Sequence, residues 1–599
     1  MKRFFPLFLL LATAAVYAPA VWNDFVWDDR ALVLQDPLIR SWRLIPEAFE
    51  HFLFTDASAS DFYRPIQRLS YTLDYAAFGF GPAGYHITSI ACHFLAAAAL
   101  FLLGLELFKM LGLADRKSCV LSLLAALVWA IHPVQSSAVV YVSGRADPLA
   151  AAFGFCGLYF GLRSLRANGA RVWLFLNGAA LLFLLSGLSK EIGLIFPALW
   201  LTILALQRNW KATARAAVAT AFVLVIYLSL RMPFEHIVPP PASTTPALVR
   251  PIIAARAVAE YAGLLALPIN LRMERDVHSH PSGFGNESMT GAAWRELQTI
   301  AGILLIGAFC YWLARERKHD PATSLCLSLA AISYLPVSGL ITLNASVAEH
   351  WLYLPSAFFF LAVACAGARL WESVSFHRSL RPLLPFAIAS WVVFLGGRTF
   401  LRTFDWKDQR TFLENTIASG GDSPRMLINL GSLEASEGHL KAAKQHLQAA
   451  LQKEPDAPLA VINLAAVAVK EGDGKAAHEL LDRAKEMPLV AAQAYEMLTV
   501  LEHKETGYAN LLRMRLAART GPPNWAIERR YVQLLDEAGS PDAAATELRH
   551  CLTTQWYRAD SWQLLGEILA KAGRGPEAQA ARIQAERYDV HLAGRGDRL

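Results

Sequence analysis

Two adjacent acidic residues follow directly after the first hydrophobic segment of this 599-residue chain. The apolar segment 4–22 is long enough to cross a bilayer, and the polar stretch after it contains Asp28 and Asp29. A carboxylate at the water side of a membrane helix can act as a general base or bind a divalent cation such as Mg²⁺ or Mn²⁺. It can equally serve as a helix cap or a topology marker. We take Asp28 and Asp29 as the candidate catalytic pair.

Other ionisable residues lie at the ends of further apolar segments. Such groups are costly at a membrane helix unless they are paired or used. Cations there can neutralise a lipid phosphate, and arginine does so through forked donors. The candidates for binding a lipid phosphate are Arg64, Arg145, Lys190, His350, His86 and His132. Each taken singly is more readily a structural residue, but together they predict a polar cleft at one face of a membrane domain.

The composition indicates a polytopic membrane protein. Hydrophobic residues make up 54% of the chain, charged residues only 18%, and the mean hydropathy is +0.31. The apolar excess fills the first 400 residues, where length and hydropathy predict about eleven membrane-spanning helices. The predicted spans are 4–22, 85–108, 118–135, 149–165, 172–188, 191–207, 213–230, 292–313, 322–343, 351–371 and 382–400. The fold class is therefore all-α.

The distribution of basic residues predicts the topology. Lysines and arginines concentrate in alternate short connections, which favours a cytoplasmic N-terminus. An odd number of spans then places the C-terminal domain outside, together with two long loops, 23–84 and 231–291. The apolar stretch 249–267 is expected to lie in the membrane interface. If it crossed the membrane instead, every later segment, including the C-terminal domain, would lie on the opposite side. Cleavage of the first segment as a signal peptide is the other alternative.

The polar tail repeats with a period of 34 residues. Gly438 recurs at Gly472, and Gly539 recurs at Gly573, with small and apolar residues at matching offsets. This period is typical of tetratricopeptide repeats, each a pair of helices. We expect about five repeats in 424–590, within a domain 404–599 that follows a membrane domain 1–403. Such arrays normally dock a protein or peptide, although a spacer or an oligomerisation surface is an alternative.

Short motifs spread along the chain resemble those of one known family. The order of the membrane domain and the repeats is also the same. The resemblance is to the transmembrane and tetratricopeptide-repeat (TMTC) O-mannosyltransferases of the GT-C glycosyltransferase superfamily. The motifs are Val26-Trp27-Asp28-Asp29, Tyr63-Arg64-Pro65, Gly84-Tyr85-His86, His132-Pro133-Val134, Gly144-Arg145-Ala146-Asp147, Leu188-Ser189-Lys190-Glu191 and Leu352-Tyr353-Leu354-Pro355-Ser356.

The resemblance implies an inverting glycosyltransferase in a membrane, expected to be the bacterial inner membrane. The enzyme would move a sugar from a polyprenyl-phosphate donor to a protein hydroxyl on the periplasmic or lumenal side, and the repeats would recruit the acceptor protein. The family's acidic pair maps onto Asp28 and Asp29, with Asp28 as base and Asp29 orienting the acceptor or holding a metal. The chain departs from the family at Ser136-Ser137, where a Thr-Glu pair is common, and at His350, where arginine is common.

Two other functions stay open from the sequence. The first is a transferase that acts on a lipid or glycan, similar to an O-antigen ligase or polymerase or to an aminoarabinose transferase. The second is a membrane scaffold or transporter that displays the repeats without catalysis. A scaffold has no need of the acid pair, and a transporter is expected to place its ionisable residues near the middle of the membrane.

Overall fold

The structure is a computed structural model that describes residues 5–55, 62–232, 246–275, 277, 286–341, 343, 345–374 and 383–592. Helices account for nearly all of its secondary structure. In these residues the sheet is limited to two short antiparallel strands, β1 (Glu274–Arg275) and β2 (Val347–Ala348). The predicted all-α class is confirmed.

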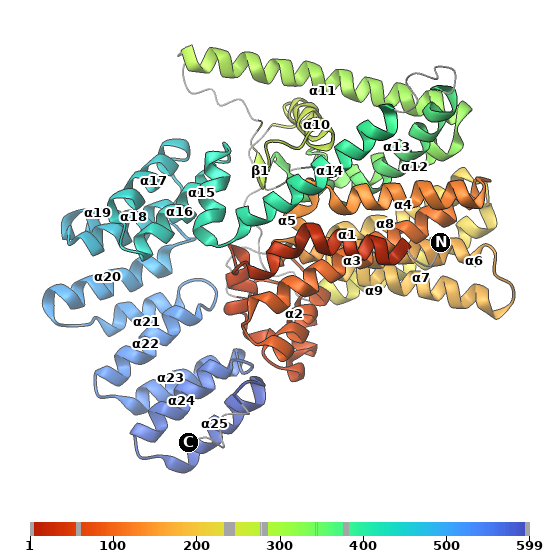
Figure 1. Ribbon diagram of the computed structural model, residues 1–599. Coiled ribbons are helices and arrows are strands. Elements are labelled where there is room, and N and C mark those ends of the chain that lie inside the picture. The colour runs from red at the N-terminus through yellow and green to blue at the C-terminus, as the bar shows by residue number, and fades with distance from the viewer. Residues whose placement is uncertain are drawn as a thin grey trace. The chain divides into compact units, whose positions relative to one another are not determined.

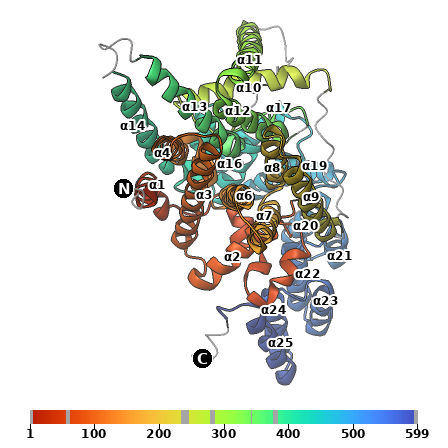
Figure 2. The same ribbon diagram turned by 90° about the vertical axis from the view of Figure 1, so that its right-hand side faces the viewer.

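The first of two compact units contains the apolar helices. It comprises residues 1–29, 62–67 and 81–409. Helices α3, α4 and α6 run alongside one another in both views (Figures 1 and 2). The α-helices of this unit are α1 (Phe5–Tyr17), α3 (Pro82–Met110), α4 (Asp115–Ile131), α5 (Ser136–Val139), α6 (Ala146–Ser164), α7 (Ala170–Ser189), α8 (Ile195–Leu206), α9 (Trp210–Arg231), α10 (Arg250–Ala266), α11 (Asn286–His319), α12 (Pro321–Tyr334), α13 (Tyr353–Val374) and α14 (Leu383–Thr403). Shorter turns complete it: η2 (Ala18–Trp22), η7 (Pro133–Gln135), η8 (Val142–Arg145), η9 (Glu191–Leu194), η11 (Leu335–Val337), η12 (Glu349–Leu352) and η13 (Phe404–Trp406).

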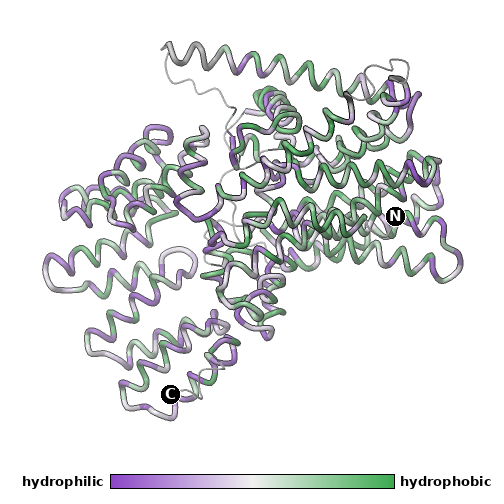
Figure 3. Tube along the Cα trace, in the orientation of Figure 1, coloured by the Kyte–Doolittle hydropathy of each residue, from purple (hydrophilic) through white to green (hydrophobic). Residues whose placement is uncertain are grey.

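A helix lies at each of the predicted spans, but not all of these helices are long and apolar enough to cross a membrane alone. Among the described residues six meet that standard, and a seventh does if α4 and the η7–α5 segment, bent by 55°, form one span. The helices 191–206 and 321–337 are apolar but shorter. Figure 3 shows the apolar character of the first unit's helices. The chain is therefore an integral membrane protein, and the number of its crossings stays a prediction.

Glycines on one face of α6 explain how closely its neighbours approach. Gly154, Gly157 and Gly161 follow one another at spacings of three and four residues, so they share a face. A Cβ at Gly154 would lie 2.0 Å from the ring of Phe196, and one at Gly161 would lie 2.6 Å from the indole of Trp200. Small residues at helix contacts are how membrane helices pack without a hydrophobic driving force between them. The sequence of α6 thus fixes the positions of α7 and α8.

The second unit contains the helix pairs of the repeats. It comprises residues 30–61, 68–80 and 410–599. After α15 (Gln409–Ala418), five helix pairs follow in the described residues: α16 (Pro424–Ser436) and α17 (Leu440–Lys453), α18 (Pro458–Glu471) and α19 (Gly474–Ala484), α20 (Ala491–Thr506) and α21 (Leu511–Arg519), α22 (Trp525–Glu537) and α23 (Pro541–Thr554), α24 (Ala559–Lys571) and α25 (Gly575–Tyr588). The periodic glycines Gly438, Gly472, Gly539 and Gly573 all have positive φ, as the turn inside a pair requires.

The division between the units differs from the predicted boundary at residues 403 and 404. Much of the first external loop belongs to the unit with the repeats. The loop consists of short turns, η3 (Arg30–Leu34), η4 (Pro37–Ile39), η5 (Trp42–Leu44) and η6 (Pro46–Phe49), followed by α2 (Pro65–Phe78). Its Leu38 and Leu44 are fully buried in a cluster with Tyr557.

The second predicted loop, 231–291, is described only in part, since 233–245, 276 and 278–285 lie outside the described residues. The stretch predicted as an interfacial helix is α10, which packs Tyr261 and Leu264 in a cluster with Val134 and Leu352. Burial against protein therefore accounts for part of its apolar face, and its position at a membrane surface stays a prediction.

Candidate active site

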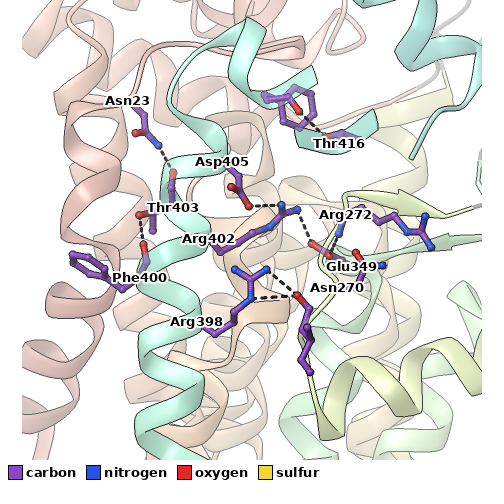
Figure 4. Close-up of polar contacts among 12 residues, drawn as sticks. Asn23, Asn270, Arg272, Glu349, Arg398, Phe400, Arg402, Thr403, Asp405 and Thr416 are labelled. Carbon is purple, nitrogen blue, oxygen red and sulfur yellow. Dashed lines mark hydrogen bonds and ion pairs between the residues drawn. The ribbon is translucent and has the colours of Figure 1, made fainter. Parts of the chain in front are cut away.

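The segment that carries the acid pair is fastened to the end of α14. The Asn23 amide donates to the Thr403 carbonyl at 2.9 Å, as Figure 4 shows. The Asp24 N–H donates to the Lys407 carbonyl at 2.8 Å, and the Trp27 N–H to the Gln409 side chain at 2.5 Å. These bonds fix the chain just before the two acids.

Trp27 has a φ of 50°. This left-handed conformation is unusual for a bulky residue, and residues held in it cluster at functional sites. The surroundings retain it: the Trp27 ring stacks on Tyr141, which stacks in turn on Trp406. The turn directs the two following carboxylates into different environments.

Asp29 is completely buried. One carboxylate oxygen accepts from the Ser143 N–H at 2.6 Å and from the Ser143 hydroxyl at 2.5 Å, and the other accepts from the Val26 N–H at 3.2 Å. Burial raises the pKa of Asp29 to about 7, against the opposing effect of these hydrogen bonds. Because its oxygens face inward and are already bonded, Asp29 holds the turn at Ser143 rather than facing a substrate.

Asp28 is only partly buried. Its N–H donates to the Tyr141 hydroxyl at 3.2 Å, and its side chain also bonds that hydroxyl. Burial, followed by the charges of Asp28 and Asp29, raises the pKa of Tyr141 well above its usual range. The phenol therefore stays protonated as a donor, and the accessible carboxylate of the pair is that of Asp28.

Arg145 is the last residue of the turn η8, two residues after Ser143, and is fully buried. Its Nε donates to the Ser89 hydroxyl at 3.0 Å, and its Nη2 donates to the Tyr85 carbonyl at 2.7 Å. The preceding Gly144 lies so close to Ser137 that a Cβ would be 2.4 Å from that residue's carbonyl oxygen. Only glycine lets η8 pass α5 at this distance, which explains the Gly-Arg sequence.

Arg64 and Lys190 each have a carboxylate partner. Arg64 binds Glu191 with its Nη2 at 2.8 Å and its Nε at 2.9 Å, and Lys190 binds Asp147 at 2.7 Å. These carboxylates hold the two cations in fixed orientations, as preorganised electrostatic stabilisation requires.

Ser143 links the start of α2 to the acid pair. The amide of Gln67, one turn after Arg64, donates to the Ser143 carbonyl at 2.8 Å. Ser143 also binds Asp29 and lies two residues before Arg145. The predicted residues Asp28, Asp29, Arg64, Arg145 and Lys190 all lie in the first unit. Ser143 bonds both Asp29 and Gln67, and so links the segments that carry Arg145 and Arg64 to the acid pair.

Two of the three predicted histidines lie in structural positions. His132 accepts from the Val134 N–H on Nδ1, and its Nε2 is 3.2 Å from the Leu265 carbonyl oxygen, so both nitrogens contact backbone groups. His86 is buried beside Tyr85, whose carbonyl binds Arg145.

His350 lies in a second polar cluster, on the half-exposed side of η12. The buried neighbour Glu349 accepts from the Arg272 N–H at 2.6 Å and pairs with Arg402 at 3.5 Å. Figure 4 shows Arg402 between Glu349 and Asp405. His350 itself is half-buried, and its role as a phosphate ligand stays a prediction.

The acid pair does not suit a metal ion as it stands. Asp29 has three hydrogen-bond donors on its carboxylate, and a divalent cation would have to displace them. No group of three histidine, cysteine or acidic side chains placed to bind a metal is found in the described part of the chain. A role for Mg²⁺ or Mn²⁺ stays a prediction.

Comparisons with known proteins match both halves of the chain. A tetratricopeptide repeat family model matches residues 434–499. Protein O-mannosyl-transferase F38B6.6 of Caenorhabditis elegans is 25% identical over 460 residues, covering 75% of this chain and 62% of its own length. Protein O-mannosyl-transferase TMTC3 of Mus musculus is 24% identical over 486 residues, covering 75% of this chain and 51% of its own.

Over three quarters of its length the chain is similar to protein O-mannosyl-transferases, TMTC3 among them. The predicted resemblance is confirmed. The chain nevertheless spans less than two thirds of the length of these relatives. Among solved structures, ArnT from Cupriavidus metallidurans bound to undecaprenyl phosphate aligns with 82% of this chain and 79% of its own, at 13% identity and a TM-score of 0.34.

Three residues of the candidate site were not predicted as site residues from the sequence. Tyr141, Ser143 and Gln67 connect the acid pair to the cationic residues. Ser143 stands directly before the Gly144-Arg145 motif, so its position gave a signal. Tyr141 and Gln67 are polar residues in apolar surroundings, and only the folded chain shows what they contact.

Proposed function

We propose that this protein is an inverting glycosyltransferase of the GT-C type. It moves a sugar from a polyprenyl-phosphate donor to a hydroxyl of an acceptor protein. The observations that carry the proposal are a partly buried carboxylate, Asp28, and two cations, Arg64 and Lys190, that carboxylates hold in place within the same unit. Similarity to O-mannosyl-transferases over three quarters of the chain supports the reaction class.

The reaction follows from these groups. The acceptor oxygen attacks the anomeric carbon and forms the new glycosidic bond, while its proton passes to the Asp28 carboxylate. The bond between the anomeric carbon and the phosphate oxygen breaks, and the electron pair leaves on the phosphate. Arg64 and Lys190, held by Glu191 and Asp147, stabilise the charge that develops there. Asp29 holds Ser143 and so positions Arg145.

The cellular arrangement belongs to the same proposal. The N-terminus is cytoplasmic, the acid pair lies on the periplasmic side of a bacterial inner membrane, and the repeats lie on that side too. Positive residues in the alternate connections support this orientation. The repeats bind the acceptor protein and raise its concentration near the acids.

The proposal is tested by transfer assays on the purified protein. Polyprenyl-phosphate mannose is the donor, and a Ser- and Thr-containing peptide or a lipid A preparation is the acceptor. We expect transfer to the peptide, and a fall of at least about a hundredfold in Asp28→Asn, since general-base catalysis contributes that much or more.

Asp24→Asn is the matched control, because Asp24 is an exposed acid four residues earlier on the same segment. It should transfer as the wild type does. Transfer to lipid A alone would instead establish a lipid-directed enzyme, and full activity of Asp28→Asn would remove the proposed base.

A further inference from the structure

Part of the first external loop packs against the repeats of the same unit. Its turns η4, η5 and η6 are three or four residues long, too short to bury an apolar face without a partner. Leu38 and Leu44 are nevertheless fully buried, because Tyr557 and the partly buried Trp556 and Tyr588 complete their cluster. The repeats therefore supply apolar surface against which this part of the loop packs.

Asp589, directly after α25, is the polar centre of the same contact. The Tyr75 hydroxyl donates to both of its carboxylate oxygens, at 2.9 and 3.1 Å. Arg40 lies 3.9 Å from it and over the Tyr75 ring at 5.1 Å. Both carboxylate and hydroxyl are buried, where a hydrogen bond to a charged group contributes more than at the surface. Asp589 is 514 residues from Tyr75 in sequence.

The two residues after Asp589 also bond the backbone of the first external loop. The Val590 N–H donates to the Arg40 carbonyl at 3.1 Å, and His591 Nε2 lies 2.6 Å from the Tyr75 carbonyl oxygen. We call this set of contacts between 38–44, Tyr75 and 587–591 the clasp.

Inside the loop, Arg68 connects the clasp to α2. It forms a buried pair with Asp36 at 2.9 Å and donates to the carbonyls of Phe52 and Leu53 at 2.6 and 2.8 Å. Breaking a buried ion pair by removing one partner is strongly destabilising. The described parts of the loop, 30–55 and 68–80, are therefore held as one body with the last repeat.

This body continues directly into the candidate active site along the chain. Arg30 follows Asp29, and Arg68 follows Gln67, whose amide binds Ser143. A loop that loses its fold would release the backbone restraint on both segments at once.

We propose that Asp589 is a positioning residue for the transfer reaction: through the clasp, the last repeat holds the first external loop folded and so orders the segments that carry Asp28 and Arg64. The inference rests on the proposed function. It gives the repeats a second role, beyond recruitment, that acts on every acceptor regardless of size.

Asp589→Ala in the full-length protein tests the clasp. We expect trypsin to cut at Arg40 and Arg43 at least about tenfold faster, since proteolysis follows the population of the open form. With polyprenyl-phosphate mannose and a short peptide, we expect kcat to fall about tenfold while the KM for the donor changes less than about twofold. Tyr75→Phe, which removes only the hydroxyl, should shift both measurements in the same direction by a smaller factor.

Two further variants separate positioning from a general loss of stability. Asp589→Asn keeps an oxygen that can accept from Tyr75, so it should recover most of the kcat. Asp542→Ala removes an exposed ion pair with Arg574 in the preceding repeat and should match the wild type.

Unchanged cleavage in Asp589→Ala would overturn the clasp. Faster cleavage with an unchanged kcat would overturn the positioning role while leaving the proposed function intact. A wild-type protein without any transfer activity would overturn the proposed function and the positioning role together, whatever the cleavage rates show.

Discussion

Asp28 and Asp29 are adjacent in the chain but have opposite environments. Asp29 is buried and accepts hydrogen bonds from Ser143 and Val26, whereas Asp28 is partly exposed and contacts Tyr141. The difference arises at Trp27, whose left-handed backbone turns the two side chains apart. Asp28 is thus the partly accessible acid of the pair, and Asp29 is built into the structure.

The buried acid predicts a pH dependence of stability. Burial raises the pKa of Asp29 from 3.8 to about 7, so the folded protein binds this proton more tightly than the unfolded chain does. The associated stability is present at low pH and is lost as the pH rises through about 7. The side chain of asparagine does not titrate in this pH range, so it contributes no such pH dependence. From about pH 5 to pH 8, the melting temperature of the wild type should fall relative to that of Asp29→Asn.

Thermal unfolding in detergent across this pH range measures the difference between the two slopes. The absolute stability of Asp29→Asn is not the test, because its amide also changes the hydrogen bonds. Parallel curves for the two proteins would contradict an elevated pKa at Asp29.

At the scale of elements, the turn η8 joins the acid pair to the cationic residues. Gly144→Ala would place a Cβ 2.4 Å from the Ser137 carbonyl oxygen. Backbone on both sides must then shift, at a cost of about 1–3 kcal/mol. Because Ser143 and Arg145 flank this position, we expect the transfer rate to fall as well as the melting temperature.

Gly263→Ala is the matched control, since Gly263 lies within α10 and its Cβ would meet nothing within 4 Å. Alanine there should leave the protein unchanged or stabilise it by up to about 1 kcal/mol. Equal behaviour of the two variants in unfolding and transfer assays would refute the close approach at η8.

The sequence predicted these elements better than it predicted their contacts. Hydropathy located the helices of the first unit, and the period of 34 residues located the repeats, because both are local patterns. The bond between Ser143 and Asp29 joins residues 114 apart, and no local pattern encodes such a pairing. His132 was a reasonable phosphate candidate by type, yet its nitrogens contact backbone of η7 and Leu265.

The contacts of the first external loop could not be predicted either, because they join residues even further apart in the sequence. Residues 30–55 have no helical or strand period, so the sequence predicted only an external loop of the membrane domain. Their partners Tyr557 and Asp589 lie more than 500 residues later. That the loop folds with the last repeat could be learned only from the structure.

At the scale of the whole molecule, the proposed topology puts the repeats on the periplasmic side of the membrane. A cysteine at exposed Ser436, in α16, should react with a membrane-impermeant maleimide in intact cells. A cysteine at Asp115, the exposed first residue of α4, should react only after permeabilisation, because the connection before it is predicted to be cytoplasmic.

Both reporters are best placed in a Cys310→Ala background, since Cys310 is the exposed cysteine among the native ones in the described chain. Labelling of the Ser436 position only after permeabilisation would reverse the orientation and remove the repeats from the compartment of the acceptor.

The central claim is that Asp28 takes the proton of a protein hydroxyl as a sugar is transferred to it. The most direct measurement is glycopeptide mass spectrometry of envelope proteins from a deletion strain. The strain is complemented with the gene for either the wild type or Asp28→Asn. The account predicts a sugar-sized mass on Ser, Thr or Tyr peptides with the wild type and its loss with Asp28→Asn at equal expression. The same glycopeptides in both cells would contradict it.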